Sequence, residues 1–287
     1  MLSILPPVDS TELANRWWRE LGTPRHAAAE LGRSAVEACS NGYYYRRDGC
    51  RVDWDHLVDA AIRTRVSIPP GASLPRSDPS GFPETRVQVR NETTLAAARR
   101  LVEEGKRPLV LNFANGVQPG GGFLNGARAQ EEVLCRSSAL FVTLHGDAMY
   151  AAHAGRPLPD SSDWAIYSPD VPVFRQDGGT ELDQQWLSSF VTCAAPYAPR
   201  LGQRSGDLLQ QRIHRVLAIA QAHGHTALVL GAWGCGAFGN DPRRTAVDFR
   251  DALENAFSGA FSDILFAITD WSPERRYLGP FRDVFAT

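Results

Sequence analysis

Residues 108–122 read PLVLNFANGVQPGGG, and residues 130–132 read QEE. The first seven residues, 108–114, form a nearly continuous apolar run, which predicts a buried strand. The three consecutive glycines at 120–122 let the backbone approach a ligand closely. Amides that turn inward before a helix N-terminus suit an anion such as pyrophosphate, although a plain flexible loop is the alternative. No Lys-Ser or Lys-Thr pair follows the glycines, which excludes a Walker A loop.

The two glutamates of the QEE triplet, Glu131 and Glu132, fall at the start of a helix predicted over residues 128–145. Neighbouring helical positions are about 100° apart, so the two carboxylates point in different directions. One carboxylate could therefore hold a substrate while the other transfers a proton. The alternative is that both residues only complement the helix dipole. Their place after a strand and a triple-glycine turn favours the catalytic interpretation.

A second glycine-rich segment, GAWGCGAFGN at 231–240, lies between a buried strand predicted over 226–232 and a helix predicted over 242–257. Residues 234–239 spell GxGxxG, the fingerprint of a Rossmann dinucleotide site. That fold needs several further strand–helix units after the glycines, whereas only the strand predicted over 263–269 remains. The segment is therefore interpreted as a second phosphate loop.

The rest of the chain from residue 85 alternates between strands and helices, which predicts a central sheet covered on both faces. In such folds, ligands bind beyond the carboxyl ends of the strands, where both glycine loops lie. The first 66 residues favour helices, and the five prolines within 67–83 indicate an irregular connector. The further predicted strands span 85–90, 165–174 and 187–194, and the further predicted helices span 11–21, 54–66, 94–105 and 207–223.

The composition limits the classes of protein to which the chain can belong. A net charge of −2 argues against a bulk electrostatic contact with nucleic acid. No stretch of about 18 apolar residues predicts a membrane span. The five cysteines are odd in number and form no CxxC pair, so a disulfide framework or a zinc site is not expected. No secretory signal is visible, and we expect a reduced cytoplasmic protein without a cofactor or a metal.

Three glycines, seven residues and then QEE resemble the signature of poly(ADP-ribose) glycohydrolases, GGG-x(6–8)-QEE. Residues 110–140 resemble the compact bacterial and fungal type of that family, and residues 231–240 resemble its diphosphate loop. The resemblance extends over about 85–287. It implies an α/β fold of the macrodomain type, with three α/β/α layers and a mixed central sheet. It also implies two parts, a helical N-terminal extension with a Pro-rich connector (1–84) and a catalytic domain (85–287).

The resemblance implies hydrolysis of the ribose–ribose O-glycosidic bonds of poly(ADP-ribose), with ADP-ribose as product. The substrates would be the polymer or ADP-ribosylated proteins, in the response to DNA damage. Glu132 would protonate the leaving ribose oxygen and then activate water, and Glu131 would bind ribose hydroxyls. Both glycine loops would hold the pyrophosphate, and Phe238 would pack on the distal ribose. The implied substrate-binding residues are Asn115, Gly120, Gly121, Gly122, Gln130, Gly234, Cys235, Gly236, Ala237, Phe238 and Gly239.

Some features stay open at this point. For the adenine pocket, only position along the chain suggests Tyr167, Ala195 and Pro196. A macrodomain that binds ADP-ribose without cleaving it is one alternative, but such a protein has no need for the glutamate pair. A mono-ADP-ribosyl hydrolase, or another ADP-ribosyl-ester or nucleotide-sugar hydrolase of the macrodomain type, is a second alternative.

Overall fold

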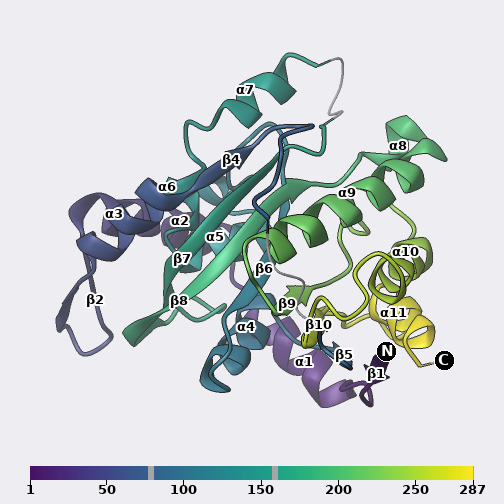
Figure 1. Ribbon diagram of the computed structural model, residues 1–287. Helices are drawn as coiled ribbons and strands as arrows, with labels where there is room; N and C mark the ends of the chain where they lie inside the picture. The colour runs from purple at the N-terminus through teal and green to yellow at the C-terminus, as the bar shows by residue number, and fades with distance from the viewer. Residues whose placement is uncertain (77–80, 157–160, 287) are drawn as a thin grey trace.

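The computed structural model describes residues 1–76, 81–156 and 161–286. Over these residues, eight strands form one mixed sheet in the order β1-β5-β10-β9-β6-β8-β7-β4 (Figure 1). The six strands from β1 to β8 in this order are parallel, whereas β7 is antiparallel to β8 and β4 is antiparallel to β7. The strands are β1 (Leu2–Ile4), β4 (Val66–Ile68), β5 (Thr85–Arg90), β6 (Pro108–Ala114), β7 (Ala165–Arg175), β8 (Glu181–Ala194), β9 (Ala227–Leu230) and β10 (Asp263–Ala267).

Helices cover both faces of the sheet, which confirms the predicted three layers. In β6, Leu109 and Leu111 pack into the core on one face, and Val110 packs into the core on the other. The first face carries α9 (Arg204–Ala222), α10 (Pro242–Glu254) and α11 (Leu278–Val284). The second carries α2 (Arg25–Asn41), α3 (Asp55–Thr64), α4 (Thr94–Glu103), α5 (Gln130–Ser137), α6 (Leu140–Leu144) and α7 (Ala148–Ala154). The chain also forms α1 (Thr11–Glu20), α8 (Ala198–Leu201), a 3-10 helix η1 (Phe123–Asn125) and a hairpin of β2 (Tyr43–Tyr45) and β3 (Arg51–Asp53).

The predicted bounds of β5 and β6 are confirmed, but the single helix predicted over 128–145 is wrong. The chain forms α5 and α6 instead, with a break at Ser138. The Ser138 hydroxyl donates to the carbonyl of Leu134 (2.7 Å) and accepts from the amide of Leu140 (3.2 Å). A serine side chain can replace the main-chain partners of a helix in this way, which an apolar periodicity does not reveal.

The sheet contains strands from both sides of the predicted division at residue 84. β1 and β4 come from the first 84 residues, and they form the two opposite edges of the sheet (Figure 1). α2 packs closely on η1, since a methyl group at Gly32 would lie 2.8 Å from the carbonyl oxygen of Phe123. The N-terminal segment is thus part of the same core. Strands of three residues are too short to show an alternating pattern, which is why the sequence analysis missed them.

Among the described residues, no helix combines the length and the apolar character that a bilayer crossing needs.

Candidate active site

The two glycine loops meet beyond the carboxyl ends of the strands because β6 and β9 are parallel neighbours. The loop after β8 joins them there, since Ala114 and Ala194 are partners at the ends of β6 and β8. These loops and the start of α5 enclose a cavity of about 270 Å³. It is lined by Phe113, Ala114, Asn115, Ala129, Gln130, Glu131, Glu132, Ala195, Ala232, Trp233, Gly234, Gly236, Ala237 and Phe238. The structure therefore brings most of the predicted site residues together.

Glu131 is buried at the inner end of this cavity. Its Oε2 accepts from the amide of Asn115 (2.7 Å), and its Oε1 accepts from Nδ2 of Asn112 (3.3 Å). Burial raises the pKa of Glu131 to about 8, and the charge of Glu132 acts in the same direction, although the bonds from the asparagines oppose the shift. The raised pKa favours the neutral form of Glu131 at pH 7.

Asn112 is a site residue that the sequence analysis missed. It is fully buried in the middle of β6, where the surrounding residues are apolar. Besides its bond to Glu131, its Nδ2 donates to the hydroxyl of Thr192 (3.2 Å) on β8. A buried amide inside an apolar strand is costly unless it is hydrogen-bonded, and this one holds the carboxyl group of Glu131. The polar residue within PLVLNFA was the available signal.

Glu132 has one fixed oxygen and one free oxygen. Its Oε1 accepts from the amide of Gly122 (3.0 Å), which orients the carboxyl group. Its Oε2 is buried and has no hydrogen-bond partner among the described residues. A buried polar atom without a partner is unfavourable, so such atoms often mark the place where a ligand binds. Because Glu132 lines the cavity, Oε2 is the atom available to a bound group.

The triple-glycine turn surrounds the two carboxyl groups, and its predicted role as a pyrophosphate loop stays a prediction. The amide of Gly121 donates to the carbonyl of Gln118 (3.0 Å), and that of Gly122 donates to Glu132. Gly121 has a φ of +56°, and a methyl group there would overlap Oε1 of Glu132 and lie 3.1 Å from Oε2 of Glu131. The anion that these amides meet belongs to the protein itself. The sequence showed an anion-binding turn but not which anion it binds.

The side chain of Gln130 is bound to the protein rather than free for substrate. Its Oε1 accepts from the amide of Phe113 (2.9 Å), and its Nε2 donates to the carbonyl of Leu111 (2.8 Å). These bonds fix the start of α5 against β6, while Gln130 also lines the cavity, so its predicted substrate contact stays a prediction.

Asn115 folds back on its own loop. Its Oδ1 accepts from the amides of Val117 (2.9 Å) and Gln118 (3.0 Å), which forms a local turn. The side-chain NH₂ is therefore the part of Asn115 that remains for a ligand at the cavity.

The loop after β9 provides amides that are free for an anion. Within the described structure, the amides of Gly236, Ala237 and Phe238 have no acceptor. The loop is held by Asn240, whose Nδ2 donates to the carbonyls of Pro196 (2.8 Å) and Gly234 (3.1 Å). Successive free amides beside a cavity form a favourable site for phosphate oxygens. Cys235 and Gly239 belong to this loop but do not line the cavity.

A second cavity of about 270 Å³ adjoins the first and shares Phe113, Gln130 and Gly236 with it. Its wall includes two aromatic residues that the sequence analysis missed, the half-exposed Trp271 and the more buried Tyr277. Both follow the carboxyl end of β10, and this position was the signal that could have found them.

Tyr167, suggested for adenine, lies outside both cavities. It stacks on the ring of His223 (3.9 Å between centroids), and its hydroxyl is 2.8 Å from Nε2 of His225. Ala195 does line the first cavity, and Pro196 serves the loop through its carbonyl. Tyr167 lies near the N-terminal end of β7, opposite Val191 of β8, but its ring packs against His223 and His225 and so does not reach the cavities.

Two further observations concern metals and thiols. In the part of the chain that the structure describes, no group of three or more His, Cys, Asp and Glu side chains could hold a metal ion. All five cysteines are described, and each is a free thiol.

The raised pKa of Glu131 predicts a pH dependence of stability. The unfolded chain releases this proton near pH 4.5 and the folded protein near pH 8, so the native state binds the extra proton between these values. The contribution of Glu131 to stability is therefore complete at low pH and declines as pH rises to about 8. Relative to Glu131→Gln, the unfolding free energy of the wild type should fall by on the order of 2–4 kcal/mol over this range. Denaturant titrations of both proteins would measure it, and a difference that does not vary with pH would contradict the assignment.

Comparisons with known proteins show which family the chain resembles. The family model for the catalytic domain of microbial-type poly(ADP-ribose) glycohydrolases matches residues 32–176. The solved structure of the poly(ADP-ribose) glycohydrolase from Thermomonospora curvata is 39% identical, with a TM-score of 0.85, and the match covers 91% of this chain and 100% of that one. No curated protein matches the sequence.

Two solved complexes also resemble the chain. The Thermomonospora curvata enzyme bound to the inhibitor ADP-HPD is 39% identical, with a TM-score of 0.83 and coverage of 90% of this chain and 99% of that one. The poly(ADP-ribose) glycohydrolase from Deinococcus radiodurans in complex with ADP-ribose is 35% identical, with a TM-score of 0.66 and coverage of 88% and 96%.

Proposed function

The chain belongs to the microbial-type poly(ADP-ribose) glycohydrolases, and from this premise we propose that Glu132 is the general acid and base of its reaction. One observation carries the proposal. Glu132 holds one oxygen on the amide of Gly122 and leaves Oε2 buried and unpaired at the cavity. A carboxyl group fixed at one oxygen can transfer a proton through the other without reorienting.

The reaction then follows from the chemistry of glycosidic bonds. As the bond between the anomeric carbon and the bridging oxygen breaks, that oxygen needs a proton, which Oε2 of Glu132 supplies. A water molecule then adds to the anomeric carbon, and its proton returns to Glu132. Glu131, in its neutral form, can donate a hydrogen bond to a ribose hydroxyl as well as accept one. We therefore assign Glu131 to holding the ribose.

The rest of ADP-ribose extends along the two cavities in this proposal. The free amides of Gly236, Ala237 and Phe238 hold the pyrophosphate, and the Asn115 NH₂ group binds the distal ribose. The ring of Phe238, which contacts Tyr197 edge-on at 5.8 Å, packs on the same ribose. The adenosine end occupies the second cavity beside Trp271 and Tyr277, because this cavity shares lining residues with the first, Gly236 among them.

Gly236→Val is expected to weaken binding without disturbing the fold. A methyl group at Gly236 would meet nothing within 4 Å, so the protein has room for the side chain. The added side chain would occupy the space proposed for the ligand, and it would keep phosphate oxygens from the amides. We expect the ADP-ribose dissociation constant to rise about tenfold or more, as for the loss of one or two charge-assisted hydrogen bonds. Calorimetry would measure it, with thermal unfolding as the control; unchanged affinity would remove this loop from the phosphate site.

The substrate class is tested by comparing two substrates. Labelled poly(ADP-ribose) and a mono-ADP-ribosylated protein would be incubated with the wild type, and the released ADP-ribose would be quantified. The proposal predicts much faster release from the polymer, because a ribose hydroxyl is then the leaving group. Faster release from the modified protein would favour the mono-ADP-ribosyl hydrolase, and binding without release from either would favour a protein that only recognises ADP-ribose.

We also propose a cytoplasmic protein that acts on the polymer or on ADP-ribosylated proteins. The five free thiols are compatible with a reducing compartment. A role in the response to DNA damage, which the family resemblance implies, stays a prediction. Counting ADP-ribosylated proteins in cells with and without the enzyme, before and after DNA damage, would test it.

A further inference from the structure

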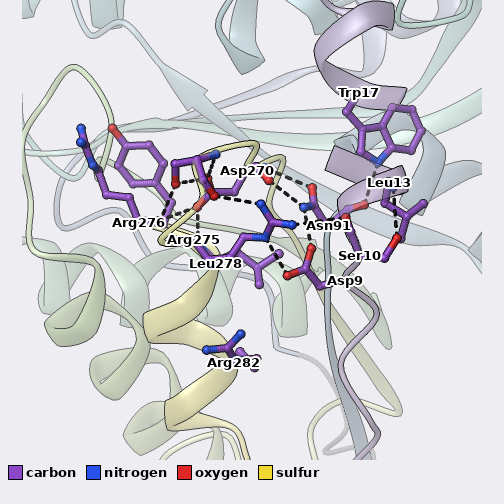
Figure 2. Close-up of polar contacts among 12 residues, drawn as sticks. Asp9, Ser10, Leu13, Trp17, Asn91, Asp270, Arg275, Arg276, Leu278 and Arg282 are labelled. Atoms are coloured by element: carbon purple, nitrogen blue, oxygen red, sulfur yellow. Dashed lines mark hydrogen bonds and ion pairs between the residues drawn. The ribbon is translucent and has the colours of Figure 1, made fainter. Parts of the chain in front are cut away.

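The wall of the second cavity comes from segments that are far apart in the sequence. Leu21 ends α1, Glu92 follows β5, and Trp271 and Tyr277 lie in the loop after β10. A polar cluster links these segments, and it includes Asn91, which precedes Glu92, and Asp270, which precedes Trp271 (Figure 2). We call it the Asn91 cluster, and it consists of Asp9, Asn91, Asp270 and Arg275.

Asn91 is the centre of this cluster, and it is almost fully buried. Its Nδ2 donates to Oδ1 of Asp9 (2.8 Å) and to the carbonyl of Asp270 (2.7 Å). Its Oδ1 accepts from the amide of Asp270 (3.1 Å). Its own carbonyl accepts from Nε1 of Trp17 (2.6 Å), one turn of α1 before Leu21. One residue thus joins the N-terminal segment, β5 and the loop after β10 (Figure 2).

Asp270 shapes the loop that carries the aromatic residues. Its Oδ2 accepts from the amides of Tyr277 (2.7 Å) and Leu278 (3.1 Å), and its Oδ1 accepts from the amide of Ser272 (2.9 Å). Burial acts to raise the pKa of Asp270, but these hydrogen bonds outweigh burial and lower it. The lowered pKa favours the charged carboxylate. Its hydrogen bonds to the amides of Ser272, Tyr277 and Leu278 fix the loop that carries Trp271 and Tyr277.

Arg275 connects the loop after β10 to the N-terminal segment. Its Nε donates to Oδ2 of Asp9 (2.8 Å), and its NH1 donates to the carbonyl of Ser272 (2.8 Å). Its backbone has a φ of +51°, a left-handed conformation that residues other than glycine rarely adopt. Such a conformation persists where the surrounding bonds hold it. The loop after β10 is therefore a fixed wall whose shape depends on the N-terminal segment.

We propose that Asn91 and Asp270 are positioning residues for the substrate, which hold Trp271 and Tyr277 in place and so determine how tightly the adenosine end binds. Neither side chain needs to touch the ligand. The inference rests on the proposed placement of adenosine in the second cavity. It also gives the N-terminal segment a part in substrate binding, because Asp9 and Trp17 complete the cluster.

The test compares two buried aspartates at opposite ends of β10: Asp263 is its first residue, and Asp270 follows its last. Asp270→Asn weakens the carboxylate bonds to the amides of Ser272, Tyr277 and Leu278 that shape the loop after β10. Asp263→Asn weakens a carboxylate paired with Arg86 and Lys106, away from both cavities. For Asp270→Asn we expect KM for poly(ADP-ribose) and the dissociation constant of ADP-ribose to rise about tenfold, with kcat unchanged. For Asp263→Asn we expect no change in KM, in kcat or in affinity.

Equal affinities of the two variants, or a loss of kcat at constant KM in Asp270→Asn, would overturn the inference. If Asp270→Asn does not fold, Arg275→Gln decides on the same measurements, with a smaller rise in KM expected and an unchanged KM contradicting the proposal. Trp271→Ala tests the placement of adenosine separately. Unchanged affinity in Trp271→Ala would refute that placement, whereas weaker binding there with unchanged binding in Asp270→Asn would refute the positioning role alone.

Discussion

Glu132→Gln is expected to lower kcat for poly(ADP-ribose) by about 10²–10⁴-fold, the usual contribution of a positioned general acid and base. The amide oxygen of glutamine can still accept from Gly122, and Oε2 has no protein partner to lose. The fold and the ground-state contacts should therefore persist, and the affinity for ADP-ribose should stay within about tenfold of the wild type. Turnover and calorimetry on the same preparation would measure both quantities.

The matched control is Glu131→Gln, which changes the neighbouring glutamate in the same way. Glu131 is assigned to the ribose rather than to proton transfer, so its variant should lose affinity as well as turnover, and less turnover than Glu132→Gln. If both residues only complemented the helix dipole, both variants would show small and similar stability losses and no specific kinetic effect. A larger loss of kcat in Glu131→Gln would reverse the two assigned roles.

Gly121→Val is expected to reduce kcat by about 10²-fold or more, because it displaces the catalytic carboxyl group. The added side chain would overlap Oε1 of Glu132 and crowd Glu131, in a backbone conformation that suits glycine. The loss should appear in kcat, in contrast to Gly236→Val, where it should appear in affinity. Kinetics of both variants, with thermal unfolding to exclude a folding defect, would separate the two glycine loops.

The opposite result for Gly121→Val would be informative. Weaker ADP-ribose binding with an intact kcat would mean that the triple-glycine turn does hold the pyrophosphate, as the sequence pattern alone indicated. Gly121→Ala provides a milder variant if the valine variant does not fold, and the same distinction between kcat and affinity applies to it.

The sequence predicted those features whose cause is local. The apolar run at 108–114 predicted β6 with its bounds, since a strand buried on both faces is apolar at nearly every position. The spacing from the glycines to Glu131 and Glu132 placed both carboxylates at the cavity. The loop at 231–240 lies between β9 and α10, as predicted. In each case, the residues that form the feature are close together in the chain.

Features that depend on distant residues could not be predicted in this way. The carboxylate of Glu132 reaches the amide of Gly122 only because α5 packs back onto β6. The two edge strands, β1 and β4, gain their conformation from their neighbours β5 and β7 and have little pattern of their own. The Asn91 cluster joins residues more than 80 positions apart, so its role appears only in the fold.

The most direct test of the whole account is the product of a single reaction. Labelled poly(ADP-ribose) would be incubated with the wild type and with Glu132→Gln, and the products would be separated by chromatography. The account predicts free ADP-ribose as the product of the wild type and almost none from Glu132→Gln. Intact polymer after incubation with the wild type, products cut at the pyrophosphate, or equal release of ADP-ribose by both proteins would contradict it.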